Sequence, residues 1–507
     1  MPNFGALNQR RNPASVMSVE RLVRDPMLPR EMTSNNFGSS EISANSEQSG
    51  ANIPMIMATI MVFIQLGRPF DQFLTGYHIP AIIGSIAIVV TLFTPWTAAI
   101  RTKTGVALMM FVGIMCLASV FSIWRGGSVA FVQYYVELNV VTFCLMAAAP
   151  ATVGQVRWLA LVGLGACLFN IGVGSAFDSM GRLYLSDAMY GNSDDVALIS
   201  GLCIPLVLLF ASRLGKVFGT IVGVAGVIGC LALIGLSAAR FSLISLAVIG
   251  LVYFVRAGGG QRVLLIVCFF AVAIGSVFLL PKNTIERLST ITSIWNSDTD
   301  ETAGITTSEA IASMKERKQL SEDALQAFTS HPVLGVGPAV FVDWRWDNLH
   351  RRGQPAHDTY LQTAAENGIF GVIFYAAFLI AVFLALRRCG KELKGWEDGR
   401  QTSLALQQCM IFFIVSASFL NCLSHSHQFV FAGLAVALDR LRQQQAEAVN
   451  AKELAPAAGA VTIQTSPARN PLRAAPPRTR PEESQPAGPV RPARYRFNRP
   501  AESSRRD

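Results

Sequence analysis

Charged residues are scarce in this chain. Only 15% of its 507 residues are charged, whereas 51% are hydrophobic. Soluble domains carry about 25% charged residues, so this shortage excludes an ordinary water-soluble protein. The apolar residues form blocks long enough to cross a bilayer, which takes about 20 residues per helix. We therefore expect an all-α polytopic membrane protein with about 12 transmembrane helices (10–12) and one long extracytoplasmic loop that contains short helices.

Three further absences exclude other classes. The first 50 residues have no apolar core of a cleaved signal peptide, so the first span must act as its own signal. Eight of the nine cysteines lie within or beside apolar blocks, and none lies in residues 281–368, which argues against a disulfide framework or a cysteine-ligated zinc site. The net charge is +9, but the basic residues form no patch interleaved with aromatic residues, so we expect no nucleic-acid partner.

The apolar blocks predict the spans and their orientation. If the N-terminus is in the cytoplasm, the cytoplasmic loops contain twelve Lys and Arg residues, and the short outer loops contain four arginines (68, 125, 182 and 240). This asymmetry agrees with the positive-inside rule. The first and last spans are short, which keeps ten- or eleven-span alternatives open. The twelve expected spans are 52–67, 79–97, 104–123, 128–149, 155–173, 195–212, 217–236, 237–255, 263–280, 369–386, 404–422 and 427–438.

Composition divides the chain into three parts. Residues 1–50 are Ser/Asn-rich and predict a disordered cytoplasmic N-terminal segment. Residues 51–440 form the expected transmembrane domain, whose loop 281–368 is too long for a simple connector. Residues 441–507 are rich in Pro, Ala and Arg and predict a disordered cytoplasmic tail.

The outer arginines run against the charge bias and need another explanation. A single arginine of this kind more often reaches to a lipid phosphate than to a ligand. Arg240 is different, because "GLSAARFSLISLAV" places it within nearly continuous apolar sequence. A charge in such a place is a functional hypothesis with a partner inside the bundle, and Glu137 is a candidate partner.

The long loop contains a predicted helix with an arginine on its apolar side. Residues 306–328 have a helical pattern that stops before the proline of "SHP". Arg317 shares a face with Ala324 and Phe328, so it points with the apolar stripe. The following "GVGPAV" at 335–340 lacks the third glycine and the Gly-Lys-Ser/Thr of a phosphate-binding loop, and we reject a nucleotide site there.

The stretch "QPAHDTYLQTAAENGIFG" (354–371) carries the strongest candidate chemistry. Asp358 is a good N-cap for a short helix that ends near Gly368. His357 then lies at a helix N-terminus, where the dipole disfavours imidazolium and a neutral general base is possible. The same position favours a bound phosphate. A histidine that only begins a re-entrant helix is an equal alternative.

The order "RKQLSEDALQAFTSHPVLGVGPAVF", a polar spacer and "AHDTYLQTAAENGIFG" resembles the O-antigen ligase/polymerase superfamily of bacterial envelope proteins. The ligase pattern is His, then Asn/Ser/Gln, nine residues, Gly, two residues and Gly/Thr/Tyr. His357, Gly368 and Gly371 match it, whereas Asp358 departs from it. "LSAARFS" (236–242) and "RLYLSDAMYGNSDDVAL" (182–198) resemble two further family segments, with Asp194 where Asn is usual. The resemblance covers roughly residues 50–440.

The resemblance implies an integral glycosyltransferase at the outer face of the bacterial inner membrane. Such a protein moves glycan from undecaprenyl-diphosphate to an acceptor hydroxyl without a nucleotide sugar, a cofactor or, in ligases, a metal. The implied roles are general base for His357, diphosphate binding for Arg182, Arg240 and Arg317, and sugar or acceptor contacts for Trp344, Trp346, Asp358 and Tyr360. The implied partners are the lipid-linked oligosaccharide, a glycan or lipid A-core acceptor, membrane lipids and other polysaccharide assembly proteins.

Between the two activities, we favour polymerisation of exopolysaccharide or O-antigen repeat units, because Asp358 violates the ligase pattern. Ligation to lipid A-core is the alternative. A transporter or flippase of the same lipid is a rival from another class, and it predicts many charges deep in the spans and an internal repeat. The sequence has one clear mid-span charge, Glu137, and no obvious repeat.

Overall fold

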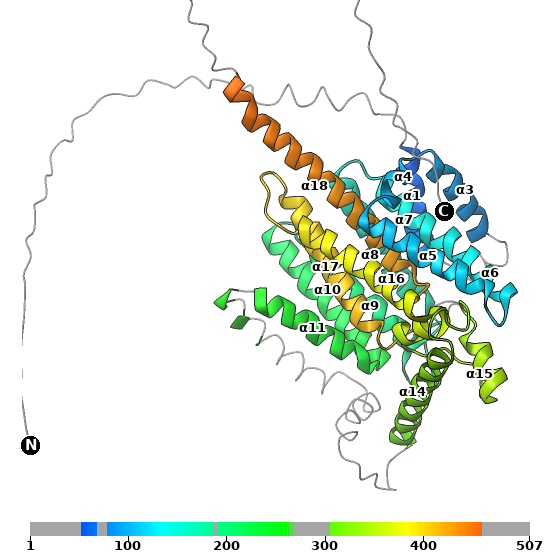
Figure 1. Ribbon diagram of the computed structural model, residues 1–507. Coiled ribbons are helices and arrows are strands. Elements are labelled where there is room, and N and C mark those ends of the chain that lie inside the picture. Colours follow the sequence, from blue (N-terminus) through cyan, green and yellow to red (C-terminus); the bar gives the residue numbers. More distant parts are fainter. Residues whose placement is uncertain are drawn as a thin grey trace, which may run out of the picture. The chain divides into compact units, whose positions relative to one another are not determined.

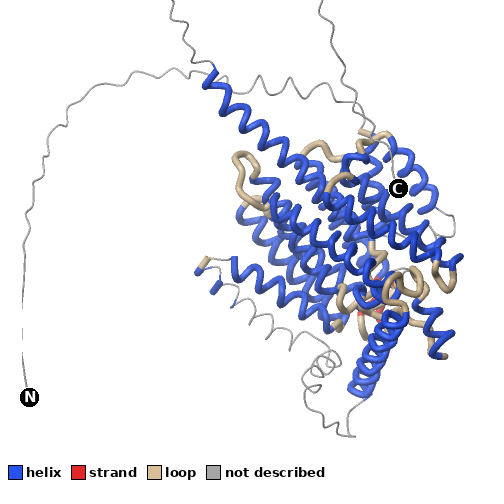
Figure 2. The backbone as a smooth tube through the Cα atoms, viewed as in Figure 1, coloured by secondary structure: helices blue, strands red, loops and turns tan. Residues whose placement is uncertain are grey.

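The computed structural model describes residues 52–67, 79–179, 181–186, 191–256, 258–260, 262–263, 266 and 305–458. Helices dominate this part of the chain (Figure 2). The chain divides into two units, residues 1–449 and 450–507. Within the described ranges, six helical segments of the first unit are long and apolar enough to cross a membrane: α5 (Lys103–Val120), Arg125–Ala148, α8 (Val153–Gly174), α9 (Ser193–Ala211), α10 (Lys216–Ser237) and α16 (Thr359–Cys389).

Shorter elements account for most of the other predicted spans. The segment 125–148 is made of α6 (Arg125–Tyr135), a π-helical turn η1 (Val136–Val140) and α7 (Val141–Ala148). The shorter apolar helices are α1 (Ile53–Gly67), α3 (Ile79–Leu92) and α11 (Arg240–Arg256), and α4 (Trp96–Ile100) is a single turn. The last two predicted spans, 404–422 and 427–438, overlap α17 (Glu397–Ser416) and α18 (Ser426–Ala458).

A mostly helical, multi-pass membrane protein is therefore confirmed, while the count of twelve spans stays a prediction. The span predicted at 263–280 and the N-terminal segment 1–50 lie almost wholly outside the described residues. The part of the chain that the structure describes also contains a small sheet. Strands β1 (Ser175–Phe177) and β2 (Leu183–Leu185) form an antiparallel hairpin in which Ala176 pairs with Tyr184.

The C-terminal helix is longer than the composition suggested. We expected the tail to begin at residue 441, but α18 continues to Ala458. Residues 441–453 consist largely of Leu, Gln, Glu, Ala and Lys, which are good helix formers, and the prolines begin only at Pro456.

Two faces of α10 show how the helices meet protein and lipid. One face packs on α9 through small residues, and a Cβ added at Gly226 would lie 2.4 Å from the Val207 side chain. The other face carries four apolar side chains at helical spacing, each more than half exposed: Val217, Ile221, Val224 and Ile228. Exposed apolar stripes are unfavourable in water and favourable against lipid tails, which fits a membrane helix.

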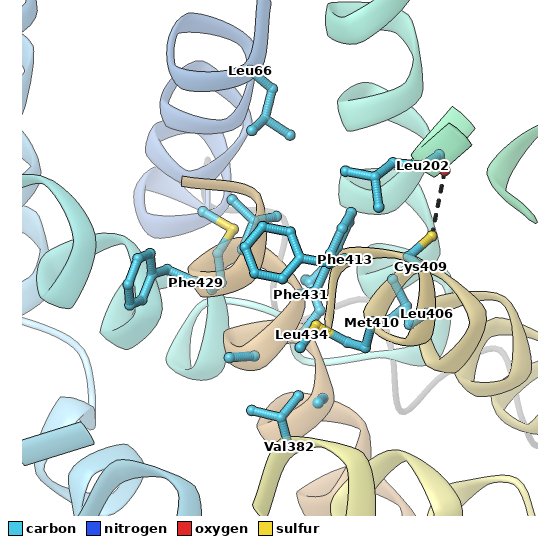
Figure 3. Close-up of a cluster of buried hydrophobic side chains, with 14 of the residues drawn as sticks. Leu66, Leu202, Val382, Leu406, Cys409, Met410, Phe413, Phe429, Phe431 and Leu434 are labelled. Atoms are coloured by element: carbon cyan, nitrogen blue, oxygen red, sulfur yellow. Dashed lines mark hydrogen bonds between the residues drawn. The ribbon is translucent and has the colours of Figure 1, made fainter. Parts of the chain in front are cut away.

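The core of the bundle is built from large apolar side chains at the meeting point of several helices. Phe413 and Met410 of α17 lie beside Phe431 and Leu434 of α18 in the close-up of Figure 3. The Cys409 thiol of α17 donates to the Leu202 carbonyl of α9 over 3.4 Å. These contacts join segments that are far apart in the sequence and hold α17 against α9.

The predicted loop helix is present as α14 (Ile305–Ser330), followed by α15 (Phe341–Leu349). Figure 1 shows both at the same end of the helical bundle. They share a small hydrophobic core that includes Ala324, Ala327, Phe341 and Trp344. The pair therefore forms a folded segment outside the spans.

A buried ion cluster stiffens this segment. Asp323 of α14 is 2% exposed and pairs with Arg345 of α15 at 2.9 Å and with Arg351. Arg345 also donates to the Arg352 carbonyl at 2.7 Å. Removing one partner of a buried pair leaves an uncompensated charge, so this cluster fixes α15 on α14.

The glycine-rich loop after α14 packs directly on the start of α16. Val336 N–H donates to the Ala365 carbonyl at 2.9 Å, and Gly337 N–H donates to the Glu366 carbonyl at 3.0 Å. Gly335 has φ +70°, and a Cβ there would lie 2.3 Å from the Glu366 backbone. The "GVGPAV" sequence thus serves close backbone packing, which agrees with our rejection of a nucleotide loop.

Candidate functional site

His357 stands at a tight turn immediately before α16. Its φ is +52°, a left-handed conformation that is unfavourable for a residue with a Cβ. Asp358 follows as the N-cap, and its carboxylate accepts from the Tyr360 N–H at 2.8 Å and the Leu361 N–H at 3.0 Å. The predicted cap is confirmed. Gly368, with φ +64°, interrupts the helix where we expected the short helix to end.

Thr359 ties this helix start to the loop between α17 and α18. Its side chain is fully buried. The hydroxyl donates to the Leu420 carbonyl at 2.5 Å and accepts from the Cys422 N–H at 2.8 Å. The Thr359 N–H also donates to the Ala417 carbonyl at 2.8 Å. The hydroxyl's bond to Leu420 spans 61 residues of sequence, and together these contacts hold the turn with His357 in place.

Arg317 reaches from α14 to the beginning of α9. Its Nη2 lies 2.6 Å from Oδ2 of Asp194, and the two side chains are 38% and 17% exposed. Asp194 lies in the first turn of α9, which Asn192 caps by accepting from the Asp195 N–H at 3.0 Å. A carboxylate is favourable at this end of a helix, since the dipole is positive there.

Arg240 joins the same neighbourhood from α11. The chain turns from α10 into α11 through Ala238, whose φ of +52° is left-handed. The charges of Arg317 and Asp194 both act on Arg240. The acidic neighbour of Arg240 is therefore Asp194, and our expectation of Glu137 is wrong. Glu137 accepts a hydrogen bond from Gln133 at 2.8 Å on an exposed face.

His357 completes a group of four, which we call the arginine–histidine cluster: Asp194, Arg240, Arg317 and His357. Burial lowers the pKa of His357 below its ordinary value of 6.5, and the positive charge of Arg317 lowers it further. Asp194 and Glu316 oppose this shift by favouring imidazolium. The result is an imidazole that stays neutral at physiological pH and can accept a proton.

Asp358 has its own electrostatic setting. Burial raises the pKa of its carboxyl group, while the N–H groups of Leu361 and Tyr360 pull in the opposite direction. The carboxylate oxygen that accepts both N–H groups caps the helix. Asn and Ser perform this task almost equally well, so the departure from the ligase pattern preserves the local structure.

Arg182 makes its contacts within the β1–β2 hairpin. Its Nε is 2.6 Å from Oδ2 of Asp178. Its backbone N–H donates to the other oxygen of the same carboxylate at 2.8 Å. The side chain of Arg182 is thus held by its own hairpin, whereas Arg240, Arg317 and His357 come together.

The aromatic candidates have three different settings. Trp344 is 4% exposed and stacks on Phe341 in the small core of α14 and α15, so it has little surface for a sugar and we do not carry that role forward. Trp346 is 63% exposed and is accessible to a sugar. Tyr360 is half-buried, and its hydroxyl donates to the Ile414 carbonyl of α17 at 2.8 Å.

Two features of the candidate site escaped the sequence analysis. Asp194 was visible only as a departure from the family's Asn, and nothing local revealed its partner. Glu366 is fully buried, and its carboxylate accepts from Gln362 at 2.9 Å and from the N–H groups of Ala339 and Phe341. These bonds join the glycine-rich loop to α16. Within the described ranges, no three His, Cys, Asp or Glu side chains are grouped to hold a metal ion.

The chain also matches a known protein family over part of its length. Residues 225–376 match the model of the family described as O-antigen ligase. This range runs from within α10 into α16 and includes Arg240, Arg317 and His357, while Asp194 precedes it. A comparison with curated proteins found no match.

Proposed function

The segment 225–376 places this multi-pass membrane protein in the O-antigen ligase/polymerase superfamily, and on this premise we propose that the chain transfers glycan from undecaprenyl-diphosphate to an acceptor hydroxyl. The product we propose is a polymer of exopolysaccharide or O-antigen repeat units. The single observation that carries the proposal is the convergence of Arg240, Arg317 and His357 around Asp194.

The two arginines suit the donor's leaving group. A guanidinium presents a planar fork of donors that matches phosphate geometry and stays charged at any physiological pH. Arg317 comes from the segment outside the spans, and Arg240 comes from the start of a membrane helix. Together they would hold a diphosphate at the membrane boundary and neutralise the charge that develops as it leaves. Arg182 remains a third proposed contact, which would require the hairpin to approach the donor.

His357 would supply the base. In the proposed step the acceptor hydroxyl loses its proton to the neutral imidazole while its oxygen attacks the anomeric carbon. The bond between that carbon and the diphosphate oxygen breaks, and undecaprenyl diphosphate leaves as an anion. Attack opposite to the leaving group inverts the anomeric configuration. Trp346, Asp358 and Tyr360 remain proposed contacts to sugar or acceptor.

The site would face the periplasm from the inner membrane. This proposal is supported by the charge of the loops, since the positive-inside rule assigns the Lys- and Arg-rich loops to the cytoplasm. Arg213 at the end of α9 and Arg157 in α8 both pair with Asp398 of α17, and all three belong to predicted cytoplasmic regions. Labelling of single cysteines placed at residues 357 and 213 tests the orientation. Equal protection of both positions from an impermeant reagent would overturn it.

Polymerase and ligase use the same donor, so the product must separate them. Loss of a secreted polymer with normal lipopolysaccharide in a deletion strain is the expected result for a polymerase. Full-length glycan left on the carrier would instead identify a ligase that acts on lipid A-core. The capping role of Asp358 is compatible with either reaction, because Asn or Ser in its place would cap the same helix.

Transfer by the purified full-length protein tests the chemistry. We expect His357→Ala to lose transfer, whereas His331→Ala retains it, because His331 is exposed and contacts Ser330 beside it. We also expect Arg240→Lys to lose transfer, since a point charge does not replace the guanidinium fork. Full turnover by correctly inserted His357→Ala protein would refute the role of His357 as base.

A further inference from the structure

Asp194 pairs with Arg317, the guanidinium that the donor diphosphate would need. In the proposed function, Arg317 binds the diphosphate, yet its Nη2 is 2.6 Å from the Asp194 carboxylate. The same carboxylate acts electrostatically on Arg240 and His357. An anionic oxygen therefore already lies among the positive charges that would receive a phosphate oxygen.

This ion pair differs from the structural pair nearby. Asp323 is 2% exposed and has two arginine partners, so breaking that cluster would leave a buried charge. The Asp194 and Arg317 side chains are 17% and 38% exposed, and water can solvate both when they separate. Pairs that water can reach contribute less to stability than fully buried ones, so a ligand of higher charge can displace the carboxylate. Asp194 also keeps a favourable position when displaced, because it remains in the first turn of α9.

We propose that Asp194 is an internal competitor for the diphosphate: it holds Arg317 before the donor binds, yields to the donor, and pairs with Arg317 again as the carrier leaves. This inference rests on the proposed function and assigns a positioning role to a residue outside the family match. The reason for such a device lies in the product. Undecaprenyl diphosphate retains both phosphates after transfer and carries more negative charge than the donor, so a competing carboxylate would help the two arginines to release it.

The competitor predicts an unusual gain of binding. Asp194→Asn keeps the shape of the side chain and removes its charge, which frees Arg317. We expect undecaprenyl diphosphate to bind about fivefold tighter, since an ion pair that water can reach is worth less than the free energy that gives a tenfold change. We also expect a lower KM for the donor and stronger product inhibition. A merely structural role for Asp194 would weaken binding instead of tightening it.

The experiment measures binding of undecaprenyl diphosphate, and separately of phosphatidylglycerol, to the purified full-length protein in detergent. Asp194→Asn is compared with Asp194→Ser, which also suits a first helical turn, and with Arg317→Gln. Asp398→Asn is the control, because Asp398 also pairs with arginines, at an exposed position among the predicted cytoplasmic regions. We expect tighter diphosphate binding for both Asp194 variants and unchanged binding for the control.

The outcomes distinguish the competitor from the diphosphate site itself. Unchanged or weaker binding by both folded Asp194 variants, with binding lost in Arg317→Gln, would overturn the competitor and leave the proposed diphosphate site intact. Unchanged binding in Arg317→Gln and in Arg240→Gln would overturn the diphosphate site and the competitor with it. An equal gain for phosphatidylglycerol would overturn the assignment of the ligand as the carrier diphosphate.

Discussion

Replacing Thr359 by Val removes a hydroxyl that joins two distant parts of the chain while it keeps the shape of the side chain. The hydroxyl donates to the Leu420 carbonyl and accepts from the Cys422 N–H in a fully buried place. A buried backbone group left without its partner costs about 1–3 kcal/mol, so the two losses together should destabilise the protein by roughly 2–6 kcal/mol. The same change frees the turn that carries His357, so transfer should slow as well.

Thermal unfolding in detergent and transfer by purified protein measure the two effects. Thr363→Val is the matched control, because the Thr363 hydroxyl is equally buried but donates to the Thr359 carbonyl within its own helix. We expect a clearly lower unfolding midpoint and slower transfer for Thr359→Val than for Thr363→Val. Equal midpoints and equal rates would refute the view that Thr359 anchors the start of α16 to the α17–α18 loop.

Three further predictions concern the same region. In a pH–rate profile, transfer should fall on the acid side with a midpoint below pH 6.5, because the pKa of His357 is lowered. Glu316→Gln should move this midpoint to a still lower pH, since the charge of Glu316 raises the pKa of His357. A midpoint at or above pH 6.5 would contradict the lowered pKa. Asp358→Asn should keep the thermal stability of the protein, whereas Asp358→Ala should lose about 1 kcal/mol with the cap, and equal stability of the two variants would exclude the cap as a stabilising feature. Ala238→Gly should raise the midpoint of thermal unfolding, since glycine relieves a left-handed conformation that costs about 1 kcal/mol. A lower midpoint would show that the packing of the Ala238 side chain stabilises the protein by more than this amount.

Local patterns predicted much of the structure around the site. The helix at 306–328, the cap at Asp358 and the break at Gly368 all depend on residues within about ten positions of one another. Helical periodicity and capping hydrogen bonds act over this range, so the sequence contains them directly. The left-handed conformation of His357 was not predictable, because histidine has no strong preference for it and the surrounding packing imposes it.

Pairing between segments could not be derived in this way. Glu137 was a reasonable partner for Arg240 on hydropathy alone, yet the π-helical turn η1 carries Glu137 on an exposed face. Trp344 and Trp346 were both expected to contact sugar or acceptor, as the family resemblance implies. The packing of α15 on α14 buries Trp344 and leaves Trp346 exposed. Which of the two is buried depends on the side of this short helix that faces its neighbour, and the local sequence does not fix that side.

The sequence by itself determined that this is a helical, multi-pass membrane protein with a folded segment between two spans, because apolar length and helical period are local properties. It also indicated the superfamily through His357 and the residues around it. Only the tertiary structure decided that Arg317 meets Asp194, a contact across 123 residues, and that Arg240 and His357 share that neighbourhood. Such contacts depend on how whole helices pack, and the free energy that selects them is spread over the entire core.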